Sequence, residues 1–212
     1  VFVDRVLYGG PDAQRVVLGA LAASTAAAAL LAGFLVHRLS ARVVTVGGVI
    51  VATAGMALMG GWTSGTAIAT VAIGMAIFGA GFGLTVTSRS TAAVESVDPA
   101  AYGLASAAVT VARMIGMAIG LAVLTAYGST TIERLSASVY ATPEGYRAYI
   151  PAELRDRPLK DPLVVAALET WAAGEAARVM VGLFVVAGAV TFLAVLPGVA
   201  LGSRAISSTS EA

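Results

Sequence analysis

Five long apolar runs constrain this 212-residue chain more than any other feature. Each run is long enough to cross a bilayer as a helix, which takes about 20 residues, and none contains Asp or Glu. The charged fraction is 12%, about half of what a globular protein carries. We therefore expect an all-α membrane protein with five transmembrane helices, at residues 15–36, 43–62, 66–87, 102–127 and 177–201.

The residue inventory excludes several classes of site. The chain has no Cys, so it forms neither disulfides nor thiolate metal sites, and its one His cannot build a His cluster. No run of Lys and Arg of the kind that binds nucleic acid is present, and the spans contain neither a catalytic triad nor a phosphate-binding loop. We expect a protein that is not an enzyme, with no cofactor, no metal and no nucleic-acid partner.

Helix-start signals predict that the last two helices are unusually long. Asp98 and Asp161 each stand at an N-cap position before a proline at the first helical position. A helix from Pro162 to Leu201 would be roughly 60 Å long, twice a bilayer core, and the fourth span can continue through residues 129–140. We expect two helices that project from one face and are joined by an ordered loop. A flexible linker with a short surface helix is the alternative.

Charge distribution predicts the orientation in a bacterial plasma membrane. The short loop at residues 37–42 carries two arginines, which favours the cytoplasmic side. The long connector then lies outside, and the C-terminus is cytoplasmic.

The chain opens with Val, and we expect it to be part of a longer protein. The expected organisation is the end of a preceding span with an outer loop (1–10), four transmembrane helices (11–127), an extracytoplasmic helical extension and loop (128–176), the final transmembrane helix (177–202) and a cytoplasmic tail (203–212).

Small and basic residues mark three further features. The loop with Gly33, Arg38 and Arg42 can hold two helix ends together through charge–dipole contacts, or it can serve topology alone. Pro197 is expected to kink the last span. Glycines concentrate in two spans, where they allow close helix packing, either static or against a moving partner. These glycines are Gly74, Gly79, Gly81 and Gly83 in the third span and Gly116 and Gly120 in the fourth.

Arg113 is the only charge away from the edges of the five spans. Its Cα lies roughly 16 Å deep, and an unpaired Arg at the centre of a bilayer costs about 3 kcal/mol on insertion scales. Its partner must be an anionic substrate, a water-lined pathway or a carboxylate outside this chain. Arg113 therefore has either a gating or substrate role or a static role as an ion pair that locks two helices.

The motif "GFLVHRLSAR" is similar to the basic loop of the major facilitator superfamily, with Gly33, Leu35, Arg38 and Arg42 in place. His37 and Ser40 stand where that loop has Asp and Gly. The stretch "YGLASAAVTVARMIGMAIGLAVL" resembles the penultimate span of the drug:H+ antiporter group with fourteen spans. The matching residues there are Gly103, Ser106, Arg113, Gly116, Gly120 and Ala122. The elongated outer hairpin resembles actinobacterial lipid and drug exporters that work beside a periplasmic lipoprotein.

The resemblance implies the C-terminal bundle of a secondary transporter that exports drugs or lipids, with proton coupling, by alternating access. The implied partners are a missing N-terminal bundle, a hydrophobic small molecule or lipid, the membrane and a periplasmic lipoprotein. The alternative function is a non-transporting membrane subunit whose outer hairpin binds a periplasmic partner.

Overall fold

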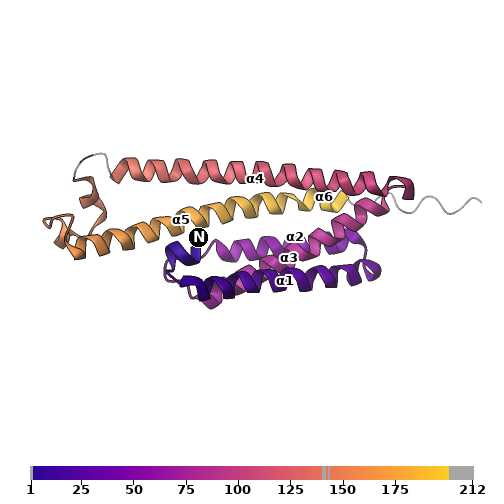
Figure 1. Cartoon of the computed structure of the whole chain (residues 1–212), viewed down its shortest axis with the longest axis horizontal. Helices are drawn as coiled ribbons and strands as arrows, with labels where there is room; N and C mark the ends of the chain where they lie inside the picture. The colour runs from indigo at the N-terminus through magenta and orange to yellow at the C-terminus, as the bar shows by residue number, and fades with distance from the viewer. Residues whose placement is uncertain (1, 140–141, 143, 201–212) are drawn as a thin grey trace, which may run out of the picture.

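The computed structural model describes residues 2–139, 142 and 144–200, and in these residues the regular structure is entirely helical (Figure 1). Five helices are long and apolar enough to cross a membrane, which confirms the expected fold class. Their bounds are α1 Gly10–Arg38, α2 Ala41–Met59, α3 Ile68–Glu95, α4 Tyr102–Val139 and α5 Pro162–Leu193. The shorter elements are the π-helix η1 Phe2–Val6, the 3-10 helices η2 Pro99–Ala101, η3 Gly145–Tyr149 and η4 Ala152–Leu154, and α6 Val195–Ala200. The expected tail at 203–212 lies outside the described residues.

Helix α3 continues to Glu95, beyond the expected end of the third span at residue 87. The extra turns are rich in Ser and Thr, which are ordinarily poor helix formers because their hydroxyls compete for backbone groups. Here the hydroxyls of Ser88, Ser90 and Thr91 bond carbonyls four residues earlier in the same helix. The polar side chains are therefore satisfied without breaking the helix.

The helix that begins at Pro162 does not run unbroken through the final span. It is interrupted at Ala194, between α5 and α6. Pro197 has no N–H to donate to the carbonyl of Leu193, four residues earlier, so the α-helical ladder fails at that point. At the break, the Ala194 N–H donates to the Thr191 carbonyl, three residues earlier. The disturbance expected from Pro197 is present, and it takes the form of a break one turn before the proline.

The two predicted helix caps have different outcomes. The Asp161 carboxylate accepts a hydrogen bond from the Leu163 N–H at 2.9 Å and begins α5 as expected. Asp98 stands at the N-cap of η2 with Pro99 after it, as predicted, but its side chain makes no cap hydrogen bond. Residues 99–101 instead form the 3-10 turn η2, and α4 begins after it.

Helix α3 is the centre of the bundle and packs against both α1 and α2 (Figure 1). A Cβ added at Gly79 or Gly83 would collide with α1, and one added at Gly81 would collide with α2. Such glycines allow the backbones to approach closely, which drives helix association in lipid. The third span's glycines therefore serve packing between helices of the same bundle.

Helix α4 stands apart from this packing. It lies along α5 and α6 on the opposite side from α1 (Figure 1), and no residue of its most apolar membrane window is buried. Its 38 residues give a length of roughly 57 Å, nearly twice a bilayer core. The predicted continuation of the fourth span beyond residue 127 is confirmed.

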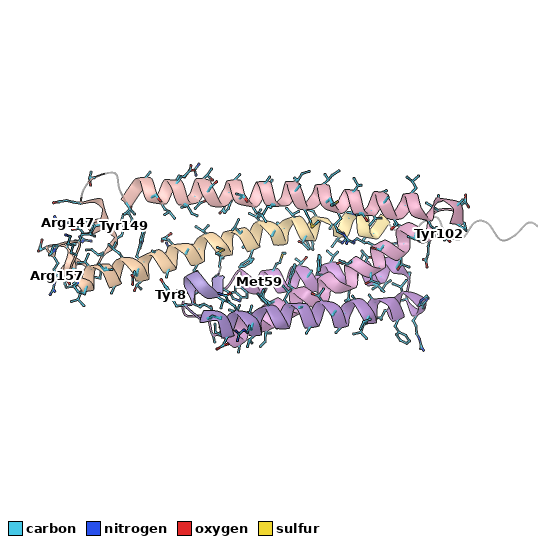
Figure 2. The ribbon with its side chains drawn as sticks, in the orientation of Figure 1. Tyr8, Met59, Tyr102, Arg147, Tyr149 and Arg157 are labelled. Atoms are coloured by element: carbon cyan, nitrogen blue, oxygen red, sulfur yellow. The ribbon has the colours of Figure 1, made fainter. Side chains whose placement is uncertain are left out.

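The C-terminal part of α4 and the N-terminal part of α5 project together beyond the other three long helices (Figure 1). Their tip is packed rather than open. The rings of Tyr149 and Trp171 lie 4.5 Å apart, and Ile150 and Val164 are buried. Figure 2 places Tyr149 at this tip and Tyr102, the first residue of α4, at the opposite end of the molecule. The described part of the connector, residue 142 and residues 144–161, contains η3 and η4, so the prediction of an ordered loop fits it better than a flexible linker.

Candidate functional site

Arg113 lies on the exposed side of α4, in the middle of the apolar span. Among the described residues it has no hydrogen bond and no ion pair. Arg89 lies on the neighbouring helix α3. The Arg89 Nε–H donates to the Thr85 carbonyl of its own helix, so Arg89 is anchored while Arg113 is not. The arrangement leaves an unneutralised cation on an exposed stretch of α4.

Gly116 and Gly120 lie one and two turns after Arg113 on α4. A Cβ at either position would meet no atom within 4 Å. Close approach to a neighbouring helix is the usual reason for glycines spaced in this way, and the described chain supplies no such neighbour. The surface formed by Arg113, Gly116 and Gly120 is called the Arg113 face below.

The basic loop joins α1 to α2 directly. The guanidinium of Arg38 lies 5.0 Å from the centroid of the Phe34 ring, in the last turn of α1 where a cation is favoured by the helix dipole. Ser40 caps α2 by accepting from the Val43 N–H at 3.4 Å. Gly33 faces open space, and Arg42 is exposed. In this structure the loop is held by a ring contact and a cap.

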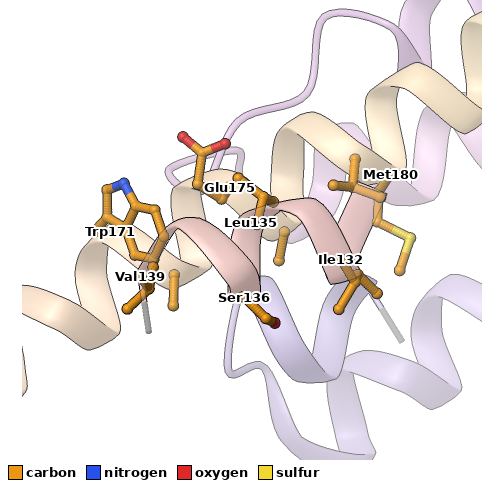
Figure 3. A pocket seen from close by; sticks show the side chains of 10 residues that line it. Ile132, Leu135, Ser136, Val139, Trp171, Glu175 and Met180 are labelled. Carbon is orange, nitrogen blue, oxygen red and sulfur yellow. The ribbon is translucent and has the colours of Figure 1, made fainter. Parts of the chain in front are cut away.

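The projecting parts of α4 and α5 enclose an apolar crevice of about 280 Å³ (Figure 3). Figure 3 shows Ile132 and Met180 at one end of it, and Val139 and Trp171 at the other. The principal apolar lining residues are Ile132, Leu135, Val139, Trp171, Val179 and Met180. A crevice with this lining suits an acyl chain or another apolar ligand better than a charged one.

Glu175 is the charged residue in the crevice lining. Its carboxylate forms an ion pair with Arg178, one turn further along α5. The negative charge of Glu175 is therefore neutralised by a residue of the same helix. The lining is thus apolar apart from one neutralised acid and the Ser136 hydroxyl.

The sequence interpretation did not identify the crevice, although part of the signal was present. Ile132, Leu135, Ser136 and Val139 recur at the three- and four-residue spacing that places side chains on one face of a helix. The residues from Trp171 to Met180 repeat the pattern on α5. Periodicity gives the face of each helix, but it does not show that the two faces are opposite each other.

Among the described residues, no three His, Asp or Glu side chains form a group that could hold a metal ion.

No protein-family model matches the chain. It is 39% identical over 110 residues to a protein of Mycolicibacterium hassiacum named triacylglyceride transporter, a match that covers 47% of this chain and 21% of the relative. A protein of the same name from Mycolicibacterium smegmatis is 34% identical over 139 residues, covering 61% and 25%. One from Mycobacteroides abscessus is 36% identical over 110 residues, covering 47% and 21%.

The matched segments thus span a fifth to a quarter of these relatives' lengths. The relatives' names are those of transporters and not of enzymes, in agreement with the expectation that this chain is not an enzyme.

Proposed function

We propose that this chain forms most of the C-terminal bundle of a secondary transporter of the major facilitator type, which exports lipid from a bacterial plasma membrane. Triacylglyceride is the proposed substrate, because the relatives carry that name and the crevice beyond the bundle is apolar. Transport occurs by alternating access, in which two helical bundles rock about a central site. The C-terminus is cytoplasmic, and the projecting parts of α4 and α5 lie outside the membrane.

One observation carries this proposal. Helix α4 is long enough to span the membrane and bears an unpaired arginine, yet no residue of its apolar window is buried among the described residues. A cation in lipid with no counter-charge is unstable, whereas the same cation against a carboxylate of another bundle is not. The Arg113 face therefore contacts the N-terminal bundle, with Gly116 and Gly120 allowing close approach in one state of the cycle.

Proton coupling is a further part of this proposal. A proton-driven exporter needs a titratable acid inside the membrane, and the five apolar spans of this chain carry no Asp or Glu. The proton-carrying carboxylate lies on the missing bundle and pairs with Arg113 when it is ionised. The acids Glu133 and Glu169 belong to the projecting helices, outside this pathway.

The projecting helices guide lipid away from the membrane or dock a periplasmic lipoprotein. The packed tip at Tyr149 and Trp171 and the apolar crevice below it support this role, because a passive linker needs neither. The second candidate function, a non-transporting subunit that binds a periplasmic partner, uses the same feature.

An export assay separates the two functions. In the complete gene product, Arg113→Ala should abolish lipid export while the protein remains in the membrane, and Arg113→Lys should retain part of it if charge matters more than geometry. Arg134→Ala, on the projecting part of the same helix, is the matched control and should export normally. Full export by Arg113→Ala would refute the role proposed for Arg113, whereas no export by the unmodified protein would refute the transporter proposal. Deleting residues 135–165 then distinguishes a working extension from a passive one.

A further inference from the structure

A close contact between α4 and the α5 backbone lies just below the crevice. A Cβ placed on Gly182 of α5 would be 2.7 Å from the hydroxyl oxygen of Tyr127 on α4, and 3.5 Å from its Cε1 and Cζ atoms. The tip of the Tyr127 side chain therefore rests in a notch that exists because residue 182 has no side chain. The two helices make few other contacts with each other.

The notch lies at the membrane end of the crevice. Ile132 and Met180 form that end (Figure 3), and Tyr127 lies five residues before Ile132 on α4, which is roughly 8 Å along the helix axis. Gly182 lies two residues after Met180 on α5. The Tyr127–Gly182 contact therefore lies between α4 and α5, where the apolar spans end and the crevice begins.

The level of the notch in the bilayer follows from its neighbours. The Phe184 ring packs edge-on against Trp62 in the turn between α2 and α3, with ring centroids 5.4 Å apart. That turn is where the bundle ends, and Trp and Tyr are enriched at such membrane–water interfaces. Gly182 is half a turn from Phe184, so the notch belongs to the interface, with apolar span on one side and the crevice on the other.

We infer that Tyr127, seated in the Gly182 notch, is a gate between the membrane interior and the crevice, which closes the path of an acyl chain along the α4–α5 seam. This inference rests on the proposed function, since it assumes that the crevice receives lipid. Tyr127 is 41% exposed, so its ring has room to leave the notch without displacing the bundle. A rotation of the side chain, or a small separation of α4 from α5, opens the seam.

The chain offers a reciprocal pair of substitutions. Gly182→Ala places a methyl group against the Tyr127 hydroxyl at a distance that real Cβ atoms do not tolerate, so the tyrosine is forced out and the gate opens. Tyr127→Phe removes only the oxygen atom, after which the nearest ring atoms are 3.5 Å from that methyl group, an ordinary contact. The double variant should therefore close again. Tyr127→Ala removes the gate altogether.

Lipid entry can be measured with a photoreactive probe. The complete gene product is reconstituted in liposomes that contain a radiolabelled glyceride with a diazirine on its acyl chain, irradiated, and digested to locate adducts at residues 132–139 and 171–180. Adducts there should rise severalfold in Tyr127→Ala and Gly182→Ala, and return to the unmodified level in Tyr127→Phe with Gly182→Ala. Gly174→Ala, at an α5 position where a Cβ meets nothing within 4 Å, is the matched control and should show no change.

The outcomes distinguish the gate from the proposed function. Equal labelling of the crevice in all variants would overturn the gate and leave the lipid path intact. Failure of Tyr127→Phe to reverse Gly182→Ala would also overturn it. No labelling of the crevice in any variant, Tyr127→Ala included, would contradict the lipid path and the gate with it.

Discussion

The hydroxyl groups of Thr45 on α2 and Ser88 on α3 lie 2.8 Å apart in a fully buried seam of the bundle. Ser88 also bonds the Leu84 carbonyl, so both helices are linked through one satisfied polar pair. In the membrane interior such a bond joins helices that hydrophobic burial alone does not hold, because lipid is as apolar as the helix surface.

Thr45→Val should therefore destabilise the bundle by about 1 kcal/mol, since it keeps the shape and removes the bond between the helices. Thermal unfolding in detergent measures the loss. Thr110→Val on α4, whose exposed hydroxyl bonds only its own helix, is the control and should be neutral. Equal effects of the two changes would mean that the bond between α2 and α3 contributes nothing specific.

Gly55→Ala tests the close packing of α2 on α3. The added Cβ would lie 2.6 Å from the Phe78 backbone nitrogen, and backbone cannot move aside as a side chain can. Overpacking of this kind costs about 1–3 kcal/mol. Gly47→Ala, on the same helix but in open space, should have no such cost. A Gly55→Ala protein as thermostable as Gly47→Ala would contradict the packing described.

Asp161 gives the start of α5 a pH dependence. The hydrogen bond from the Leu163 N–H, followed by the bond from Arg157, lowers the pKa of this carboxyl from its ordinary value. A lowered pKa in the folded state means that the stabilisation is present above the unfolded-state value of about 3.9 and is lost as the pH falls through the lowered pKa. Amide exchange at Leu163 should therefore accelerate in acid, corrected for its intrinsic pH dependence.

The Asp161→Ala protein provides the comparison. Its Leu163 amide should exchange faster than that of the unmodified protein at neutral pH, and the difference should vanish in acid. An identical exchange rate in the two proteins at neutral pH would show that the cap does not stabilise this helix start.

The contact between Tyr149 and Trp171 is expected to keep the connector ordered. Trp171→Ala removes the ring that lies against Tyr149, and with it much of the apolar contact that holds η3 to α5. Proteolysis between residues 151 and 161 should become faster, while thermal unfolding of the membrane bundle should be unchanged. Unaltered proteolysis would favour a connector whose order does not depend on this contact.

The sequence predicted those parts of the fold that depend on local pattern. Apolar length gave the five spans, the Asp161–Pro162 pair gave the start of α5, and Pro197 gave a break near its end. Asp98 stands at the predicted N-cap position, but its side chain makes no hydrogen bond there, which the residue type alone does not guarantee. The end of α3 was missed because its Ser and Thr hydroxyls bond back to the helix.

Features between helices could not be predicted in this way. The Thr45–Ser88 bond and the Tyr127–Gly182 contact join residues far apart in sequence, and their pairing depends on how α2 and α3, or α4 and α5, are aligned along each other. A single sequence contains the face of each helix but not that alignment. Arg113 was predicted only in part. The sequence shows a charge in the middle of an apolar span, and the structure adds that the surrounding residues of α4 are not buried.

The most direct test of the central claim is to identify what touches the Arg113 face. A photoreactive amino acid replaces Gly120 in the complete gene product, the membranes are irradiated, and the crosslinked peptides are identified by mass spectrometry, with an unirradiated sample as the control. The account predicts a crosslink to a membrane-spanning peptide of the same protein outside this 212-residue chain. Adducts with lipid alone would contradict the claim that α4 faces a second bundle.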